Sequence, residues 1–373
     1  MRTSGLRLTV VAALTIVLAG CETAPSAPTA PLPSPSTTPS DTAQVQPAGD
    51  PTVVATGLNA PWSVVRLENG SALISERDTA AIKELTSSGE VREAGTVAGV
   101  APGGEGGLLG IEVLDDDGLW LYAFVTSDSD NRIVRMPLEG EPGSLSLGEA
   151  SVVLGGIEKA GNHNGGRIKL GPDGMLYATT GDAGNASLSQ DPGSLNGKIL
   201  RMTPDGSAPA DNPTPGSLVY TLGHRNSQGL TWDEAGRMWA AEFGQNAWDE
   251  LNLIEPGHNY GWPEVEGAAG VEGFDDPVYQ WSTAEASPSG LAHVDNTLFL
   301  AALRGQALWA AYPVDDRVDA VAWFTLEYGR LRDATPGPDG SLWVLTNNTD
   351  GRGNPAPDDD KLLEIRLVEL TEG

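Results

Sequence analysis

The sequence is poor in cysteine, in basic residues and in histidine. Its 373 residues include one cysteine, four histidines and 22 lysines and arginines, against 51 aspartates and glutamates. Because the single cysteine is Cys21, disulfides contribute nothing to the folded part. The net charge of −29 argues against nucleic acid as a partner, since that binding depends on cationic side chains that neutralise phosphates. Any positively charged pocket must therefore be a local arrangement that opposes the field of the whole chain.

Long apolar runs are also scarce, and the clearest one lies at the N-terminus. Arg2 and Arg7 precede the run Leu8–Ala19, which is short for a membrane span and typical of a secretory signal. The run ends in Leu-Ala-Gly-Cys, which resembles a bacterial lipobox. We therefore expect residues 1–20 to be a lipoprotein signal peptide and Cys21 to carry the lipid, with an ordinary signal peptide as the alternative. The expected location is extracytoplasmic, at the bacterial membrane or cell surface.

Residues 21–50 are expected to form a disordered tether. They consist mainly of Pro, Ala, Ser and Thr, with almost no large apolar side chain. Such a segment cannot bury enough surface to offset the entropy lost on ordering. The folded domain is therefore predicted to span residues 51–373.

A turn followed by a strand of alternating apolar residues recurs six times in this domain. The turns are built on Asp-Gly, Asn-Gly and related pairs, which supply the positive φ that hairpins need. Their anchors lie 44 to 62 residues apart, at Gly70, Gly118, Gly174, Gly236, Asn296 and Gly340. A repeat of this length with several strands is typical of a β-propeller, so six repeats predict six blades.

The predicted fold class is thus all-β, a six-bladed propeller with four-stranded antiparallel blades. We expect Thr52–Ala55 to close the ring by pairing with the last blade near Leu362–Leu367, which hides edge strands. A β-sandwich with coincidental turns is the alternative, but it would not space one motif so evenly. Propellers carry function on loops around one mouth of the central channel.

The stretch Leu222–Pro263 concentrates two kinds of loop residue. Its first half offers positive charge and amide donors, and its second half offers hard oxygen ligands. The first group is Gly223, His224, Arg225, Asn226 and Gln228; the second is Glu242, Asp249, Glu250 and the carbonyls of Gly244, Gln245 and Asn246. This combination predicts an anionic ligand bound together with a hard cation, with calcium favoured.

Two other loops hold single candidates. Glu105 is the one functional side chain in the glycine-rich run Gly103–Gly110, whose glycines serve either a ligand or a tight crossover between blades. His163, in the polar loop Gly161–Arg167, is the best candidate for a general base, because imidazole titrates near neutral pH. An incidental loop histidine is the alternative.

Arginines supply the remaining candidates. Arg225 beside Asn226 can clamp a carboxylate or quinone oxygen, with a structural salt bridge as the alternative. Arg330 and Arg332 point the same way on an extended segment and repel each other unless an anion lies between them. The alternative for this pair is a solvated strand edge bridged by acidic residues.

Together these motifs resemble the soluble PQQ-dependent glucose/sorbosone dehydrogenase family, particularly its aldose sugar dehydrogenase branch. The motifs occur in order along residues 51–368: GEGGLLG, NHNGGRI, GHRNSQGL, DELNLI followed by NYGWP, and GRLRD. Each is weak alone, but the combination is specific. The resemblance implies a six-bladed propeller that uses PQQ and calcium to oxidise the C1 hydroxyl of aldoses to lactones.

The resemblance also implies individual roles. His163 would take the proton of the anomeric hydroxyl, and Arg225 would stabilise negative charge on the quinone oxygen. The other residues that would contact PQQ are Glu105, Asn226, Arg304, Arg330 and Arg332. The calcium ligands would be the carbonyls of Gly244 and Gln245 at the activating site, and Glu250 with the carbonyl of Tyr260 at a second site.

Several positions depart from the family pattern. Gln245 replaces a common Pro, Glu105 stands where some relatives have Gln, and Arg304 replaces a Lys. A Tyr that some relatives carry after Pro263 is missing, and the loops are short, which favours an open, permissive sugar site. The expected partners are an aldose, an unidentified electron acceptor, and the membrane only through the lipid at Cys21.

Two other functions stay open. A calcium-dependent sugar lactonase would need several carboxylates converging on one metal. A non-catalytic propeller lipoprotein that binds glycans or a protein would have little reason to keep His163, Arg225, Asn226, Arg330 and Arg332 together.

Overall fold

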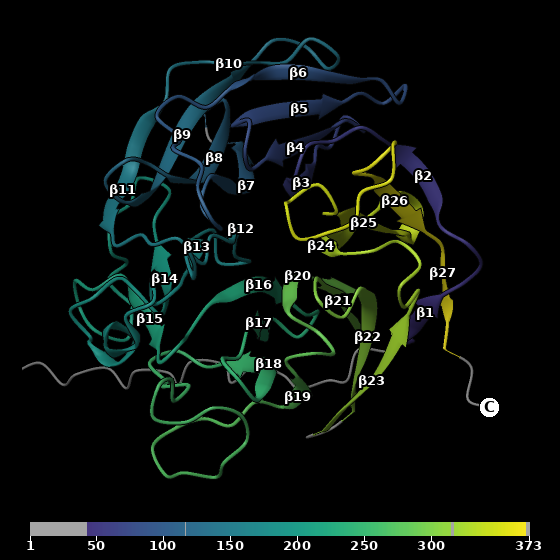
Figure 1. Cartoon of the computed structure of the whole chain (residues 1–373). Coiled ribbons are helices and arrows are strands. Elements are labelled where there is room, and N and C mark those ends of the chain that lie inside the picture. The colour runs from purple at the N-terminus through teal and green to yellow at the C-terminus, as the bar shows by residue number, and fades with distance from the viewer. Residues whose placement is uncertain (1–42, 116, 315–316, 371–373) are drawn as a thin grey trace, which may run out of the picture. The chain divides into compact units, whose positions relative to one another are not determined.

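The computed structural model describes residues 43–115, 117–314 and 317–370. The expected signal peptide, Cys21 and most of the tether lie outside these residues. The described chain forms six antiparallel sheets of four strands or more, arranged as blades around a central axis (Figure 1). The predicted six-bladed propeller is therefore confirmed. Its only helical segments within the described ranges are two short 3-10 turns, η1 (Ala186–Gln190) and η2 (Pro338–Gly340), and none could cross a membrane.

The strands follow the chain from blade to blade. The first blade consists of β3 (Pro61–Arg66), β4 (Ala72–Glu76), β5 (Ala81–Leu85) and β6 (Val91–Thr96). The second consists of β7 (Leu108–Asp115), β8 (Leu119–Thr126) and β9 (Asn131–Glu139), with β10 (Ser146–Leu147) and β11 (Ser151–Ile157) both paired to β9. The third consists of β12 (Ile168–Leu170), β13 (Leu176–Thr180), β14 (Lys198–Met202) and β15 (Val219–Leu222). The next two are β16 (Ser227–Trp232), β17 (Met238–Glu242), β18 (Trp248–Ile254) and β19 (Tyr279–Ser282); and β20 (Pro288–Val294), β21 (Thr297–Ala302), β22 (Ala307–Val314) and β23 (Arg317–Trp323).

The sixth blade closes the ring. It combines β24 (Leu331–Pro336), β25 (Leu342–Thr346) and β26 (Leu362–Ile365) with β2 (Thr52–Ala55) from the other end of the domain. The register places Thr52 opposite Glu364 and Val53 opposite Leu363, as the predicted closure requires. Pairing the two ends of the domain covers the edge of β26 with β2.

The tether ends earlier than predicted. Val45–Pro47 form β1, which pairs with β27 (Leu367–Glu369). Val45 is buried and hydrogen-bonded to the Thr297 side chain, so the folded unit begins before residue 51. Val45 and Pro47 are both buried, so this short strand docks with two of its three side chains.

The repeated turns mark one end of every blade. Each anchor, from Gly70 between β3 and β4 to Gly340 between β24 and β25, lies between the first and second strands of its blade. Five of the six strands that follow are buried at every position, as in β4, β13 and β21, and β8 is buried at all but its first two, rather than half-buried as the alternation suggested. The reason is that neighbouring blades cover both faces; Leu73 and Leu121, for example, share one core between the first two blades.

Because strand direction alternates, the links between blades lie at the face opposite to these turns. The loops between second and third strands also reach that face. These two sets of loops carry most of the predicted site residues; Arg332 lies in β24, Glu250 in β18, and Tyr260 between β18 and β19.

Candidate active site

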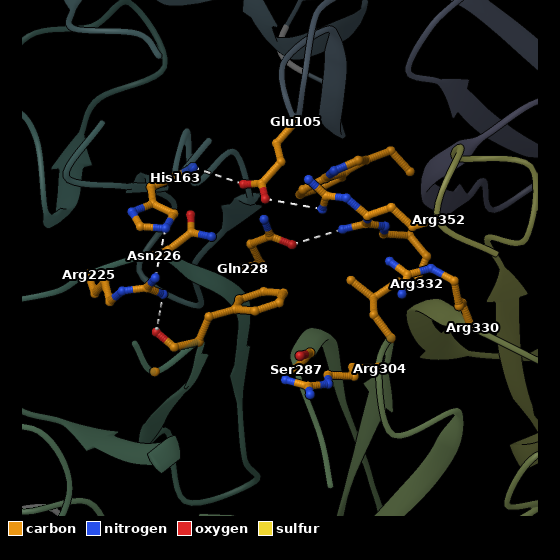
Figure 2. Close-up of a pocket in the computed structure, with 14 residues that line it drawn as sticks. Glu105, His163, Arg225, Asn226, Gln228, Ser287, Arg304, Arg330, Arg332 and Arg352 are labelled. Atoms are coloured by element: carbon orange, nitrogen blue, oxygen red, sulfur yellow. Dashed lines mark hydrogen bonds and ion pairs between the residues drawn. The ribbon is translucent and has the colours of Figure 1, made fainter. Parts of the chain in front are cut away.

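A pocket of about 270 Å³ opens at the mouth of the central channel. Figure 2 shows His163, Asn226 and Arg225 on one side of it and Arg352, Arg332 and Arg330 on the other, with Gln228 between them. The predicted site residues that line it are Glu105, His163, Arg225, Asn226, Gly244, Arg304, Arg330 and Arg332; the others are Trp62, Gln228, Phe243, Ser287, Leu303 and Arg352. Five arginines and one carboxylate thus face this space in a strongly acidic protein.

His163 is held between a carboxylate and a guanidinium. Its Nδ1 lies 2.8 Å from Asp182 Oδ1, and its Nε2 lies 2.8 Å from Arg225 Nη2. Because arginine only donates hydrogen bonds, Nε2 must be an acceptor. Nδ1 therefore carries the ring proton and donates a hydrogen bond to Asp182. The geometry therefore gives a neutral imidazole whose basic nitrogen faces the pocket.

Asp182 fixes this orientation. Its side chain is buried and also accepts bonds from the Gly184 N–H at 2.7 Å and from Trp262 Nε1 at 2.9 Å. Burial acts to raise the pKa of Asp182, but the hydrogen bonds from His163, Gly184 and Trp262 outweigh it and hold the pKa below its usual range. The carboxylate therefore stays ionised at neutral pH and accepts the hydrogen bond of the His163 Nδ1–H group.

Arg225 has no carboxylate hydrogen-bonded to its guanidinium in the described structure. Its Nε donates to Gln245 Oε1 at 2.9 Å, and its Nη1 donates to the Phe243 carbonyl at 3.1 Å. The guanidinium also lies 5.6 Å from the centre of the Trp262 ring. The structural salt bridge considered for Arg225 is thus not formed. Beside it, Asn226 Oδ1 accepts the Gly165 N–H at 3.0 Å, which leaves the amide Nδ2 as the group that can donate to a ligand.

Arg332 is the most unusual cation in the pocket. It is 5% exposed, and its partners are neutral: Gln228 Oε1 at 2.9 Å, Ser289 Oγ at 3.3 Å and Asn347 Oδ1 at 3.2 Å. Burial lowers the pKa of Arg332 to about 9, so the group stays charged at neutral pH at a cost in free energy.

A second buried arginine, Arg167, has the carboxylate partner that Arg332 lacks within the described chain. Arg167 is 1% exposed and lies 4.4 Å from the centre of the Trp62 ring, where Arg332 lies at 5.7 Å. Arg167, however, forms an ion pair with Asp333 at 3.0 Å. Of these two neighbours, only Arg332 faces the pocket, and only Arg332 lacks a carboxylate partner among the described residues.

The other two predicted cofactor arginines differ from each other. Arg330 donates to Asp350 at 2.9 Å, so the acidic bridge considered for this pair is formed at Arg330 and not at Arg332. Arg304 is exposed on the turn after β21, and its one side-chain hydrogen bond to the described residues is a 3.4 Å bond to the Thr283 carbonyl. Arg304, Arg330 and Arg332 all line the pocket.

Glu105 bridges two loops. One oxygen accepts the His163 N–H at 2.8 Å, and the other lies 3.2 Å from Arg352 Nη1. Its charge therefore has a cationic partner within the pocket wall. The glycines around it serve the crossover between blades, since a Cβ at Gly104 would lie 2.0 Å from the Gly161 carbonyl oxygen.

The loop Gly244–Trp248 turns its amides away from the pocket. Glu266 Oε1 accepts the N–H groups of the four residues from Gln245 to Trp248 at 2.6 to 3.3 Å, and Asp249 accepts the Gly244 N–H at 2.8 Å. Burial acts to raise the pKa of Glu266, but the four amide bonds outweigh it and lower the pKa. Within the described chain, the carbonyls of Gly244 and Gln245 receive no hydrogen bond, so their oxygens are available to a cation.

Two acidic residues of this region, Glu242 and Asp249, accept hydrogen bonds from nearby backbone N–H groups. Glu242 accepts bonds from the Arg225 and Asn226 N–H groups and from His224, whose ring is buried and stacked on Tyr260. Asp249 holds the Gly244 and Ser287 N–H groups, and burial raises the pKa of Asp249 to about 6. Glu242, His224 and Asp249 therefore shape the loops and are not free ligands.

Glu250 and Tyr260 do not line the pocket. Glu250 lies opposite Glu242 in the β17–β18 ladder and accepts bonds from Gly267 N–H and Asn252 Nδ2. Burial raises the pKa of Glu250, and the charge of Glu242 raises it further. The Asn252 Oδ1 atom is buried without a hydrogen-bond partner, so this interior has oxygen atoms that a cation would satisfy.

Sequence reasoning missed Asp182, Trp62 and Arg352. Asp182 follows β13 in a Gly-Asp-Ala-Gly turn, which is a usable signal because a loop acid directly after a strand can reach the next blade connection. Nothing local marks Trp62 or Arg352, since their roles depend on side chains more than 40 residues away.

The chain is similar in sequence and fold to known sugar dehydrogenases. Residues 58–362 match the profile of the family described as Glucose / Sorbosone dehydrogenase. The solved structure of the PQQ-bound aldose sugar dehydrogenase of Streptomyces coelicolor is 50% identical, covers 87% of this chain and 98% of its own, and superposes with a TM-score of 0.83. A putative glucose dehydrogenase of Thermus thermophilus is 39% identical over 85% of this chain and 99% of its own, with a TM-score of 0.78. The aldose sugar dehydrogenase YliI of Escherichia coli is 28% identical over 79% of this chain and 89% of its own.

Proposed function

The chain belongs to the Glucose / Sorbosone dehydrogenase family, and on that basis we propose that it oxidises the C1 hydroxyl of aldose sugars to lactones with PQQ and calcium. When bound, PQQ supplies the quinone that takes up the hydride, and calcium supplies the positive charge that polarises this quinone. The chain itself must hold these groups, orient the sugar and move one proton.

The buried charge of Arg332 carries this proposal. An uncompensated guanidinium at the wall of a pocket is a receptor for an anion, because an incoming carboxylate offsets its desolvation. PQQ carries three carboxylates, and Arg304 and Arg330 offer two further donors around the same space. Arg225, opposite them, would face the quinone oxygen, with the amide of Asn226 beside it.

The calcium site fits as well. Calcium takes carbonyl oxygens, and the oxygens of Gly244 and Gln245 are unpaired because Glu266 and Asp249 bind the amides of the same loop. Gln245 in place of a Pro is compatible, since the backbone is the ligand and its side chain supports Arg225. Glu250 and the carbonyl of Tyr260, two buried residues outside the pocket lining, would hold the second calcium.

His163 acts as the general base that takes the proton of the C1 hydroxyl. Nε2 accepts the C1 hydroxyl proton as the C1 hydride leaves, and Asp182 stabilises the imidazolium through Nδ1–H. Because Arg225 donates to Nε2 in this structure, its guanidinium must turn from His163 before the hydroxyl can bind there. The same movement would direct Arg225 toward the developing negative charge.

The other two functions fit less well. Among the described residues, no three His, Cys, Asp or Glu side chains are grouped to hold a metal, whereas a lactonase would need such a cluster. A binding propeller has no use for an aspartate that fixes the tautomer of a pocket histidine. The lipid anchor at Cys21, the extracytoplasmic location and the electron acceptor remain predictions.

The test is reconstitution of the full chain with PQQ and calcium, followed by dye reduction with a panel of aldoses and identification of the lactone. Turnover should require both additions. His163→Ala should bind PQQ yet lose about 10²- to 10⁴-fold in rate, whereas His293→Ala, at the opposite face, should not. If PQQ fails to bind at millimolar calcium, the proposal is wrong.

A further inference from the structure

The pocket continues into a second hollow of about 200 Å³ that shares three of its arginines. Arg304, Arg330 and Arg352 line both spaces, and Gln306 and Asn348 complete the polar wall of the second. No aspartate or glutamate is among the described residues that line this hollow. In a chain with 51 acidic and 22 basic residues, such a segregation of charge creates a local attraction for anions.

Arg352 is more weakly engaged than Arg330. Its side chain is 53% exposed, and its one ion pair, with Glu105, is 3.2 Å long. An exposed pair of this kind contributes little and is easily exchanged. Arg330, in contrast, is tied to the buried Asp350.

Glu105 also connects Arg352 to the loop that carries His163. Its two oxygens bind the His163 N–H at 2.8 Å and Arg352 Nη1 at 3.2 Å. The His163 backbone N–H and the Arg352 guanidinium therefore bind the two oxygens of one carboxylate. His163 and Arg352 line the same pocket, so a sugar with its C1 hydroxyl at His163 can direct its far end toward Arg352.

We propose that Arg352 and the hollow behind it form a subsite for the negatively charged group of an acidic aldose, a hexuronic acid being the simplest example. This inference rests on the proposed function and names the substrate class of the same site. The sugar carboxylate replaces Glu105 on Arg352, and Arg304 adds attraction from the opposite wall. Neutral aldoses reach His163 without this contact.

The test compares kcat/KM for glucuronate and glucose in the PQQ- and calcium-loaded full chain. The glucuronate-to-glucose ratio should fall about tenfold in Arg352→Gln, because one charge-assisted contact is lost. It should rise in Glu105→Gln, which removes the carboxylate that competes for Arg352. Arg237→Gln is the matched control, since it removes the same charge from an exposed pair with Asp233 at the opposite face. The ratio also corrects for any loosening of the His163 loop, which would slow both sugars alike.

Two further readouts separate the possible failures. About 0.5 M NaCl should lower the ratio in wild type but not in Arg352→Gln, because salt screens the contact. Ligand-observed NMR with the unloaded protein should detect Arg352-dependent binding of glucuronate over glucose, independent of turnover. A ratio unchanged in both Arg352→Gln and Glu105→Gln overturns the subsite, as does a loss of PQQ affinity in Arg352→Gln without a change in ratio. Absence of dye reduction with every sugar would instead refute the proposed function.

Discussion

Replacing Arg332 or Arg167 by Met should move stability in opposite directions. Both arginines are buried beside the Trp62 ring, and Met fills similar volume without charge. Arg332 has neutral partners, whereas Arg167 neutralises the buried Asp333. The comparison therefore separates the cost of a buried cation from the loss of packing.

The magnitudes follow from these partners. Lowering the pKa of Arg332 from 12.5 to about 9 corresponds to roughly 5 kcal/mol of disfavoured charge. Met leaves the acceptor oxygens of Gln228 and Asn347 without their donor, which costs about 3 kcal/mol together. Arg332→Met should thus raise the free energy of unfolding by about 2 kcal/mol. Arg167→Met strands the Asp333 charge and should lower it by about 3–5 kcal/mol.

Urea unfolding of the full chain without added cofactor measures both effects. With PQQ and calcium present, wild type should gain stability through ligand binding and Arg332→Met should gain little. The reasoning is refuted if Arg332→Met destabilises the unloaded protein as much as Arg167→Met, or if it binds PQQ as tightly as wild type.

Two other changes test the supports of the site. Asp182→Asn should lower kcat by about 10²- to 10⁴-fold with PQQ affinity retained, because the Nδ1 proton of His163 loses its carboxylate. The pKa of Asp182 is lower in the folded protein than in the unfolded chain, so its ionised form stabilises the fold above pH 3.8. This contribution is lost as the pH falls toward the folded pKa. The difference in unfolding free energy between wild type and Asp182→Asn, measured with urea, should therefore disappear at low pH. Glu266→Ala should weaken calcium binding at least about tenfold by calorimetry, because four amides lose their acceptor and the loop carbonyls lose their orientation, and Glu266→Gln should weaken it less. Unchanged calcium affinity in Glu266→Ala would show that Glu266 does not position the loop.

The fold was predictable because its signals are local. Turn residues such as Gly174 and Gly340 must adopt positive φ, and the anchors do so in five blades; in the fifth, Asp295 does so in place of the anchor Asn296. The closure by Thr52–Ala55 followed from the need to protect edges. The tether boundary was wrong because the docking of Val45 depends on Thr297, a partner 252 residues away that no local pattern reveals.

The candidate site was predictable as a set of residues but not as a network. Alternation placed Arg330 and Arg332 together, yet only the fold brings Asp350 to one and not to the other. Glu242 has the chemistry of a metal ligand, but the amides of the neighbouring strand end occupy it. Which acids stay free depends on backbone approach between blades, and sequence spacing carries little of that information.

The most direct test of the central claim is a single-turnover measurement with glucose carrying deuterium at C1. The PQQ- and calcium-loaded protein is mixed with labelled or unlabelled sugar, and the reduction of bound PQQ is followed by absorbance. We predict reduction without any added acceptor, a primary isotope effect in wild type, and loss of reduction in His163→Ala at unchanged PQQ occupancy. Reduction that is equally fast in His163→Ala, or no reduction of fully loaded wild type by any aldose, would contradict the assignment.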